Sequence, residues 1–180
     1  MNDLLDGDLM IPVLLAETSL LHVLTVSFVV IGLSVCLHAL VMEQLYNRLC
    51  KPSRHGWTRL TVIVLILLLT HTVQIMMFGL AYHTMVDATH GFEGVYDGSF
   101  YDAVYFSAAV YTTVGFGDIT PLGYLRLMVS FEALAGLVLI AWSASFTFVA
   151  MSKLAKPDDR EPDDMVDHTL AAHDADEPPA

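Results

Sequence analysis

The most specific chemistry in this sequence lies in a seven-residue stretch, TTVGFGD, which runs from Thr112 to Asp118. It carries no charge before Asp118 and no obvious nucleophile. Gly115 and Gly117 alternate with larger residues and can take left-handed backbone angles that a Cβ disfavours. A strand of alternating handedness can aim successive carbonyl oxygens to one side. The stretch is therefore a candidate for binding a cation through its main chain.

Several copies of such a strand are needed to surround an ion. Arranged around an axis, they give rings of oxygens that replace the water of a dehydrated cation, and non-helical backbone is tolerated at membrane depth where it lines such a cavity. One strand per chain cannot enclose an axis, so the stretch implies an assembly of several chains.

Three apolar segments surround this stretch and must position it. Hydrophobic residues make up 55% of the chain and charged residues only 16%, which favours an integral membrane protein. A spanning helix needs about 20 apolar residues, and residues 19–46, 60–86 and 124–151 each provide them. We therefore predict an all-α membrane protein with three transmembrane helices, the last two forming a pore domain over residues 60–151.

A shorter apolar segment, SFYDAVYFSAAVYTT, precedes the candidate strand and is too short to span. It is typical of a re-entrant helix, predicted over residues 99–112 and followed by the loop 113–118. Ser99 and Asp102 have the spacing of a capping box at its start. If this helix enters the membrane from outside, the negative end of its dipole favours a cation near the bilayer centre.

Basic residues predict the orientation. Those between the first two helices and after the third should mark the cytoplasmic side: Arg48, Lys51, Arg54, Arg59, Lys153, Lys156 and Arg160. The acidic segment 1–18 is then outside, and the loop 47–59 and the tail 156–180 are cytoplasmic. The tail carries nine of the twenty acidic residues and is predicted to be disordered. A partner or a divalent cation bound there, with His168 and His173 as weak ligands, is the less favoured alternative to a solvated tail.

TTVGFGD, preceded by a short helix and flanked by two spanning helices, resembles the selectivity filter of potassium channels. The resemblance covers roughly residues 60–151 and implies a homotetramer in the lipid bilayer, with K⁺ as the permeant ion and no other cofactor or metal. The ion-binding residues that it implies are Thr113, Val114, Gly115, Phe116 and Gly117. In this assignment the Thr113 hydroxyl closes the inner end of the ion row, and Gly117 forms the outer turn.

The same resemblance implies residues that support the filter. Asp118 should sit behind it and accept a hydrogen bond from Tyr105, where the best-known members have a tryptophan. Phe116 stands at a filter tyrosine position and Phe106 at that of its tryptophan partner, so we predict that the two rings pack together. Thr112 completes the predicted support.

Ala109 stands where some relatives carry a buried carboxylate that helps to control filter inactivation, so nothing about inactivation is carried over. Gly136 lies in the predicted span 124–151, the inner helix of the pore domain, at a position where many relatives have a hinge glycine. Close helix packing is the alternative role. His71 and Glu132 are ionisable residues inside spanning segments, which indicates function by default. We expect them either to approach each other or to place Glu132 against the pore helix as a proton-sensitive brace, with an ordinary structural contact as the favoured alternative.

The function predicted is a potassium-selective channel that conducts K⁺ passively across a cell membrane, by resemblance a bacterial inner membrane. The alternatives are a less selective cation channel and a non-conducting membrane subunit that acts through a partner. No catalytic constellation or nucleic-acid motif is present in the sequence, so we do not expect an enzyme. The first helix lacks repeated arginines and is predicted to be peripheral, with a regulatory or partner-binding role as the alternative.

Overall fold

The computed structural model describes residues 3–49, 56–86 and 91–154, with the side chains of the first helix described from residue 19 onward. These ranges form four helices and one small antiparallel sheet. In chain order the elements are α1 (Asp3–Leu49), α2 (Gly56–Met85), β1 (Phe92–Gly94), α3 (Phe100–Tyr111), β2 (Ile119–Pro121) and α4 (Leu125–Leu154).

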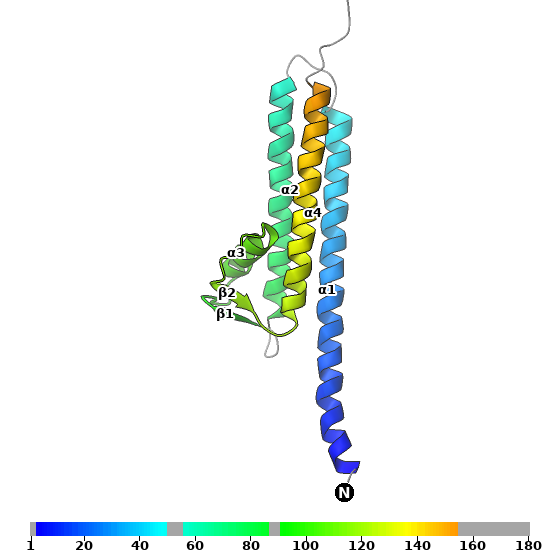
Figure 1. Ribbon diagram of the computed structural model, residues 1–180, viewed down its shortest axis with the longest axis vertical. Coiled ribbons are helices and arrows are strands. Elements are labelled where there is room, and N and C mark those ends of the chain that lie inside the picture. The colour runs from blue at the N-terminus through cyan, green and yellow to red at the C-terminus, as the bar shows by residue number, and fades with distance from the viewer. Residues whose placement is uncertain (1–2, 50–55, 87–90, 155–180) are drawn as a thin grey trace, which may run out of the picture.

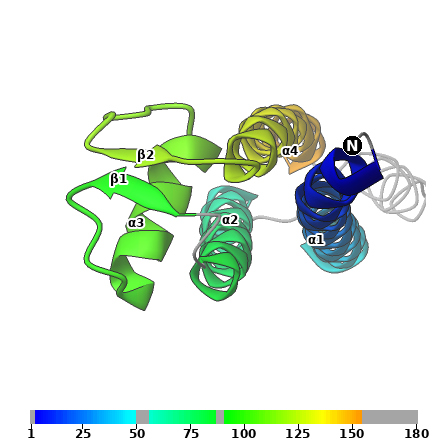
Figure 2. The ribbon, with the colours of Figure 1, turned by 90° about the horizontal axis from the view of Figure 1, so that it is seen from below.

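The three long helices lie side by side along the long axis of the molecule (Figure 1). Helices α2 and α4 form the centre, and both contact α1 on one side and α3 on the other. Figure 2 shows this order from below, with α3 and the sheet on the side of α2 and α4 away from α1. The short helix thus packs against both α2 and α4 (Figure 2), which fixes the direction of the strand that follows it.

Three of the described helices are long and apolar enough to cross a membrane: Ser19–Leu49, Gly56–Met85 and Leu125–Leu154. Large apolar side chains such as Leu21, Phe28 and Leu134 are exposed on them, as expected for helices that face lipid. The predicted all-α membrane protein with three spanning helices is confirmed, and the chain is a multi-pass membrane protein.

The helices extend further than the predicted spans. The first begins at Asp3, so most of the segment 1–18, which we predicted as separate, continues the helix α1. The second begins at Gly56 rather than at residue 60, and α1 ends at Leu49, so only residues 50–55 separate them. Hydropathy marks where a helix leaves the apolar layer, whereas the backbone stays helical through neighbouring residues that also favour helix.

The inner helix α4 runs from Leu125 to Leu154, so it begins one residue later and ends three residues later than predicted. The tail 156–180, His168 and His173, and four of the seven basic residues used for the orientation, Lys51, Arg54, Lys156 and Arg160, lie outside the described residues. The same holds for Cys50, while Cys36 is an exposed free thiol in α1.

The short helix α3 begins with a cap that differs from the predicted capping box. Ser99 is the N-cap residue and its hydroxyl accepts from the Asp102 N–H at 3.1 Å, as expected. The Asp102 carboxylate accepts from the Asp97 N–H instead of from Ser99, and the Ser99 N–H donates to Asp97 at 2.8 Å. Two carboxylates therefore secure the helix start. The hydrogen bonds from Ser99 hold the pKa of the Asp97 carboxyl below its ordinary value.

This cap predicts a pH dependence of stability. Because the folded-state pKa of Asp97 is lowered, its contribution is complete above the unfolded pKa of about 3.9 and is lost as the pH falls through the folded value. Wild type should therefore exceed Asp97→Asn in thermal stability at pH 5 to 7, and the difference should shrink toward pH 3. Unfolding followed by circular dichroism in detergent measures it. Glu93→Gln, at an exposed carboxylate in β1, is the control and should show a smaller effect; equal profiles for both variants contradict the prediction.

Candidate ion-conduction site

The stretch after α3 adopts the alternating backbone that its glycines predict. Thr113, Gly115 and Gly117 have φ angles of 60°, 55° and 79°, whereas Val114 and Phe116 between them do not have positive φ. A β-branched residue rarely adopts this region, so Thr113 extends the alternation one step beyond the glycines at a strain of about 1 to 3 kcal/mol. Every second residue is therefore left-handed.

The carbonyl oxygens of this strand remain available. Within the described ranges, no hydrogen-bond donor reaches the carbonyls of residues 113–117. The whole segment 112–118 is exposed in the single chain, although it follows a helix that packs against α2 and α4. Such a strand, kept at the end of a helix, offers one side of a carbonyl site that further copies would have to complete.

The inner end of the strand is fixed by the last turn of α3. The Thr112 hydroxyl and N–H both donate to the Ala108 carbonyl, at 2.7 and 3.1 Å. The Thr113 N–H donates to Val110 at 2.9 Å, and the Gly115 N–H donates to Ala109 at 3.0 Å. These three N–H groups thus bind the end of the helix, and no donor from the described residues reaches the carbonyls of the strand.

The outer end is held by a tyrosine and by the sheet. The Tyr105 hydroxyl donates to the Asp118 carboxylate at 2.8 Å, which is the expected contact. That hydrogen bond raises the pKa of the Tyr105 hydroxyl, so it remains a donor at neutral pH. The Asp118 carbonyl accepts from the Val95 N–H at 3.1 Å, and a Cβ at Gly94, whose φ is +102°, would overlap that carbonyl.

The predicted contact between Phe116 and Phe106 is wrong. Phe116 instead stacks on Tyr105, with ring centroids 6.1 Å apart and an interplanar angle of 5°. Phe106 is buried behind the strand, where it packs on Tyr82 at 5.3 Å and on Phe92 at 4.7 Å. Adjacent residues on a helix point in directions about 100° apart, so Tyr105 faces the strand while Phe106 faces the core.

Removing the Tyr105 hydroxyl tests this outer clamp. Tyr105→Phe keeps the ring that stacks on Phe116 but leaves the Asp118 carboxylate without that donor, so the midpoint of thermal unfolding in detergent should fall by a few degrees. Tyr101→Phe is the matched control, since Tyr101 lies on the same helix and is 84% exposed. Identical melting of the two variants would show that the clamp does not stabilise the outer end.

Comparison with known proteins agrees with this geometry. Residues 70–153 match a protein-family model described as "Ion channel". Over 78 residues the chain is 35% identical to the inward rectifier potassium channel Kirbac3.1 of Paramagnetospirillum magnetotacticum, an alignment that covers 43% of this chain and 25% of that protein. Both matches support an ion channel, and the matched relative is described as a potassium channel. The family match includes α3, the candidate filter and α4, and it leaves α1 outside.

Gly136 allows α4 to pack closely against the end of α3. Helix α4 continues through this position, and a Cβ there would overlap the carbonyl oxygen of Tyr111, the last residue of the pore helix α3. The glycine therefore lets the inner helix touch the backbone just before the filter. The hinge at Gly136 stays a prediction.

Glu132 braces the back of the pore helix, as one of the two expected arrangements requires. Its carboxyl is fully buried and accepts a hydrogen bond from the Tyr82 hydroxyl. Ser107 Oγ, on α3, lies 2.5 Å from Glu132 Oε1 and 2.9 Å from the Ile75 carbonyl oxygen. Serine has one hydroxyl hydrogen, so both contacts are complete at once when the carboxyl carries a proton. The brace thus joins α2, α3 and α4 behind the filter.

If Glu132 is protonated, two substitutions at this position should differ in their effect on thermal stability. A glutamine accepts from Tyr82 and donates to Ser107, so Glu132→Gln should melt close to wild type. Glu132→Leu deprives the buried Tyr82 hydroxyl of its acceptor and should cost about 1 to 3 kcal/mol of unfolding free energy. Thermal unfolding in detergent separates the two, with the exposed Ser130→Ala as control. If Glu132→Gln is as damaging as Glu132→Leu, the carboxyl is not protonated in this contact.

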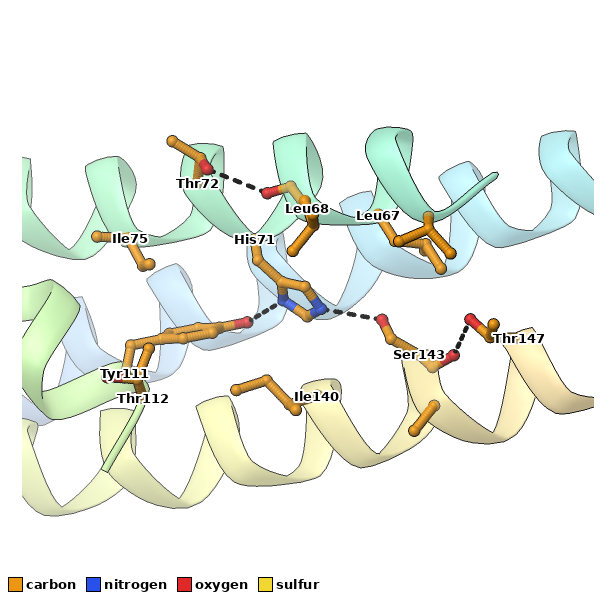
Figure 3. A pocket seen from close by; sticks show the side chains of 12 residues that line it. Leu67, Leu68, His71, Thr72, Ile75, Tyr111, Thr112, Ile140, Ser143 and Thr147 are labelled. Carbon is orange, nitrogen blue, oxygen red and sulfur yellow. Dashed lines mark hydrogen bonds between the residues drawn. The ribbon is translucent and has the colours of Figure 1, made fainter. Parts of the chain in front are cut away.

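His71 does not bond Glu132 and belongs to a second polar cluster. Its Nδ1 lies 2.9 Å from the Tyr111 hydroxyl and its Nε2 lies 2.9 Å from Ser143 Oγ, so the imidazole connects α3 to α4 (Figure 3). These side chains border a pocket of about 410 Å³ that is otherwise mostly apolar. The expected approach of His71 to Glu132 is wrong, because each finds hydroxyl partners closer to it.

Several polar residues of these clusters were not selected from the sequence. They are His38, Gln74, Tyr82, Ser107 and Tyr111, all of them buried. Gln74 offered a signal, since a polar amide three residues after His71 in an apolar helix needs a partner. The tyrosines and the serine gave none, because their hydroxyls are common in membrane helices. Among the described residues, no group of three or more His, Cys, Asp or Glu side chains could hold a metal ion.

Proposed function

We propose that the protein is a potassium-selective channel that conducts K⁺ passively through the backbone carbonyls of residues 113–117. The observation that carries the proposal is the alternation of left-handed residues at Thr113, Gly115 and Gly117, combined with carbonyls that no donor in the described chain occupies. Such a strand offers oxygens in place of water, and the relative named above is a potassium channel by its description.

Assembly of four copies completes the proposed site. One chain supplies one strand, whose segment 112–118 is exposed on the side of the molecule away from α1. Four strands around an axis give rings of four carbonyls, and each α3 ends at Tyr111 next to the inner end of its strand. The negative end of the helix dipole then favours a cation below the filter. The homotetramer is therefore part of the proposal.

The side chains around the strand favour K⁺ over a less selective pore. Asp118 is the acidic residue of the stretch, and its carboxylate is bonded to Tyr105 rather than lying free at the axis. Phe116 places an apolar ring at the outer part of the strand, stacked on Tyr105. Selection would then rest on the carbonyls alone.

We also propose that the N-terminus is outside and the C-terminus cytoplasmic, in a bacterial inner membrane. Helices α1, α2 and α4 place Arg48, Arg59 and Lys153 at one end of the bundle, opposite to the end that carries the pore loop. Basic residues mark the cytoplasmic end of membrane helices. The acidic tail as a site for a partner or a divalent cation is a weaker proposal, carried by its composition.

Measurement of reversal potential in liposomes tests the conduction proposal. With K⁺ inside and Na⁺ outside, wild type should show a reversal potential that follows the K⁺ gradient. Gly115→Ala and Gly117→Ala should lose most of the K⁺ flux, because a Cβ at these positive φ angles is strained by more than about 1 kcal/mol. Gly32→Ala is the control, since Gly32 is exposed in α1 with open space around it.

Three results would contradict the proposal. Equal permeability of Na⁺ and K⁺ indicates the less selective cation channel. No flux from correctly assembled protein indicates a non-conducting subunit that acts through a partner. Full K⁺ flux in both filter variants would place the conduction path elsewhere.

A further inference from the structure

Five buried or half-buried side chains form a closed hydrogen-bond ring across all four helices. His38 comes from α1, His71 and Gln74 from α2, Tyr111 from α3 and Ser143 from α4. The two imidazoles are 5.2 Å apart between ring centroids. This ring lies directly behind the end of the pore helix, and α1, which takes part in it, is outside the segment that matches the channel family.

The amide of Gln74 fixes the direction of the ring. Its Nε2 donates to the Ser34 carbonyl at 3.0 Å and lies 3.4 Å from His38 Nδ1. Its Oε1 accepts from the Tyr111 hydroxyl at 2.7 Å. Because the amide nitrogen has hydrogens and no acceptor site, His38 Nδ1 must be the acceptor. The single proton of a neutral His38 is therefore on Nε2.

The remaining bonds follow from that tautomer. His38 Nε2 donates to Ser143 Oγ at 3.3 Å, so the serine hydrogen is available for His71 Nε2 at 2.9 Å. His71 then carries its proton on Nδ1, which lies 2.9 Å from the Tyr111 hydroxyl oxygen and 3.1 Å from Gln74 Oε1. Each side-chain donor and acceptor of the ring has a partner when both histidines carry one proton.

The ring acts on the filter through Tyr111. This tyrosine is the last residue of α3, it is fully buried, and its carbonyl oxygen is packed against Gly136. The next two residues are Thr112 and Thr113, where the left-handed alternation begins. A buried donor left without a partner costs about 1 to 3 kcal/mol. Loss of any member of the ring therefore destabilises the arrangement that holds Tyr111, the residue before Thr112 and Thr113.

We propose that α1 is a working part of the pore and that His38 is a positioning residue for the filter. Through Gln74, Ser143 and His71, it holds the Tyr111 hydroxyl and thereby the direction of the chain at Thr113. This inference rests on the proposed channel function, and it assigns a role to the helix that the sequence had predicted to be peripheral.

The ion-selectivity test compares two histidines of the same helix. His38→Phe keeps an aromatic ring but removes both nitrogens, and it should lower the K⁺/Na⁺ permeability ratio in liposomes by about fivefold or more. His22→Phe is the matched control, because His22 is exposed on α1, and it should leave the ratio unchanged. His38→Gln should restore part of the selectivity, since its amide oxygen can accept from Gln74 while its nitrogen donates to Ser143.

A double-mutant cycle tests the ring without any conduction. His38 and Tyr111 share no hydrogen bond, yet both belong to the ring, so the drop in unfolding midpoint for His38→Phe with Tyr111→Phe should be smaller than the sum of the two single drops. If the drop in unfolding midpoint of the double variant equals the sum of the two single drops, the inferred hydrogen-bond ring is wrong. A non-additive cycle with an unchanged permeability ratio in His38→Phe overturns the positioning role. Wild type that fails to conduct while the cycle stays non-additive refutes the channel proposal and leaves the ring standing.

Discussion

The carbonyl oxygens of residues 113–117, to which no described residue donates, are the constraint on which the rest of the pore domain depends. Polar backbone buried in a membrane normally pairs with itself, so a strand that leaves its carbonyls open must be held by every other group it has. The N–H groups of Thr113 and Gly115 bond the end of α3, Asp118 bonds Tyr105, and the chain beyond Asp118 pairs with β1. The supporting structure therefore acts on the strand from behind and from both ends.

The parts of this arrangement that sequence could predict are those set by short-range chemistry. Two glycines at alternate positions require a backbone that few other residues tolerate, and Tyr105 lies where its hydroxyl can reach Asp118. The contact of Phe116 with Phe106 was wrong because helix rotation separates neighbouring rings. The pairing of β1 with β2 had no sequence signal, since three-residue strands are too short to show a pattern and the need for glycine at Gly94 depends on a partner 24 positions away.

The first helix shows how a signal can be present and still be missed. Ser27, Ser34 and His38 are spaced by seven and four residues, which places them on one face of a helix, and all three are fully buried. A polar stripe on an apolar helix predicts a packed face rather than a peripheral one. What the stripe could not reveal is the partner, because Gln74 and Ser143 lie 36 and 105 residues from His38.

The contact between Gly136 and the Tyr111 carbonyl also decides how force travels through the molecule. The part of α4 that follows Gly136 extends beyond α3 (Figure 1), whereas at Gly136 the backbones of α4 and α3 touch without an intervening side chain. In the proposed channel, a tilt of the part of α4 beyond Gly136 would pivot at this contact, two residues before Thr113. A movement of α4 would then reach the start of the proposed filter through backbone contact rather than through a flexible side chain.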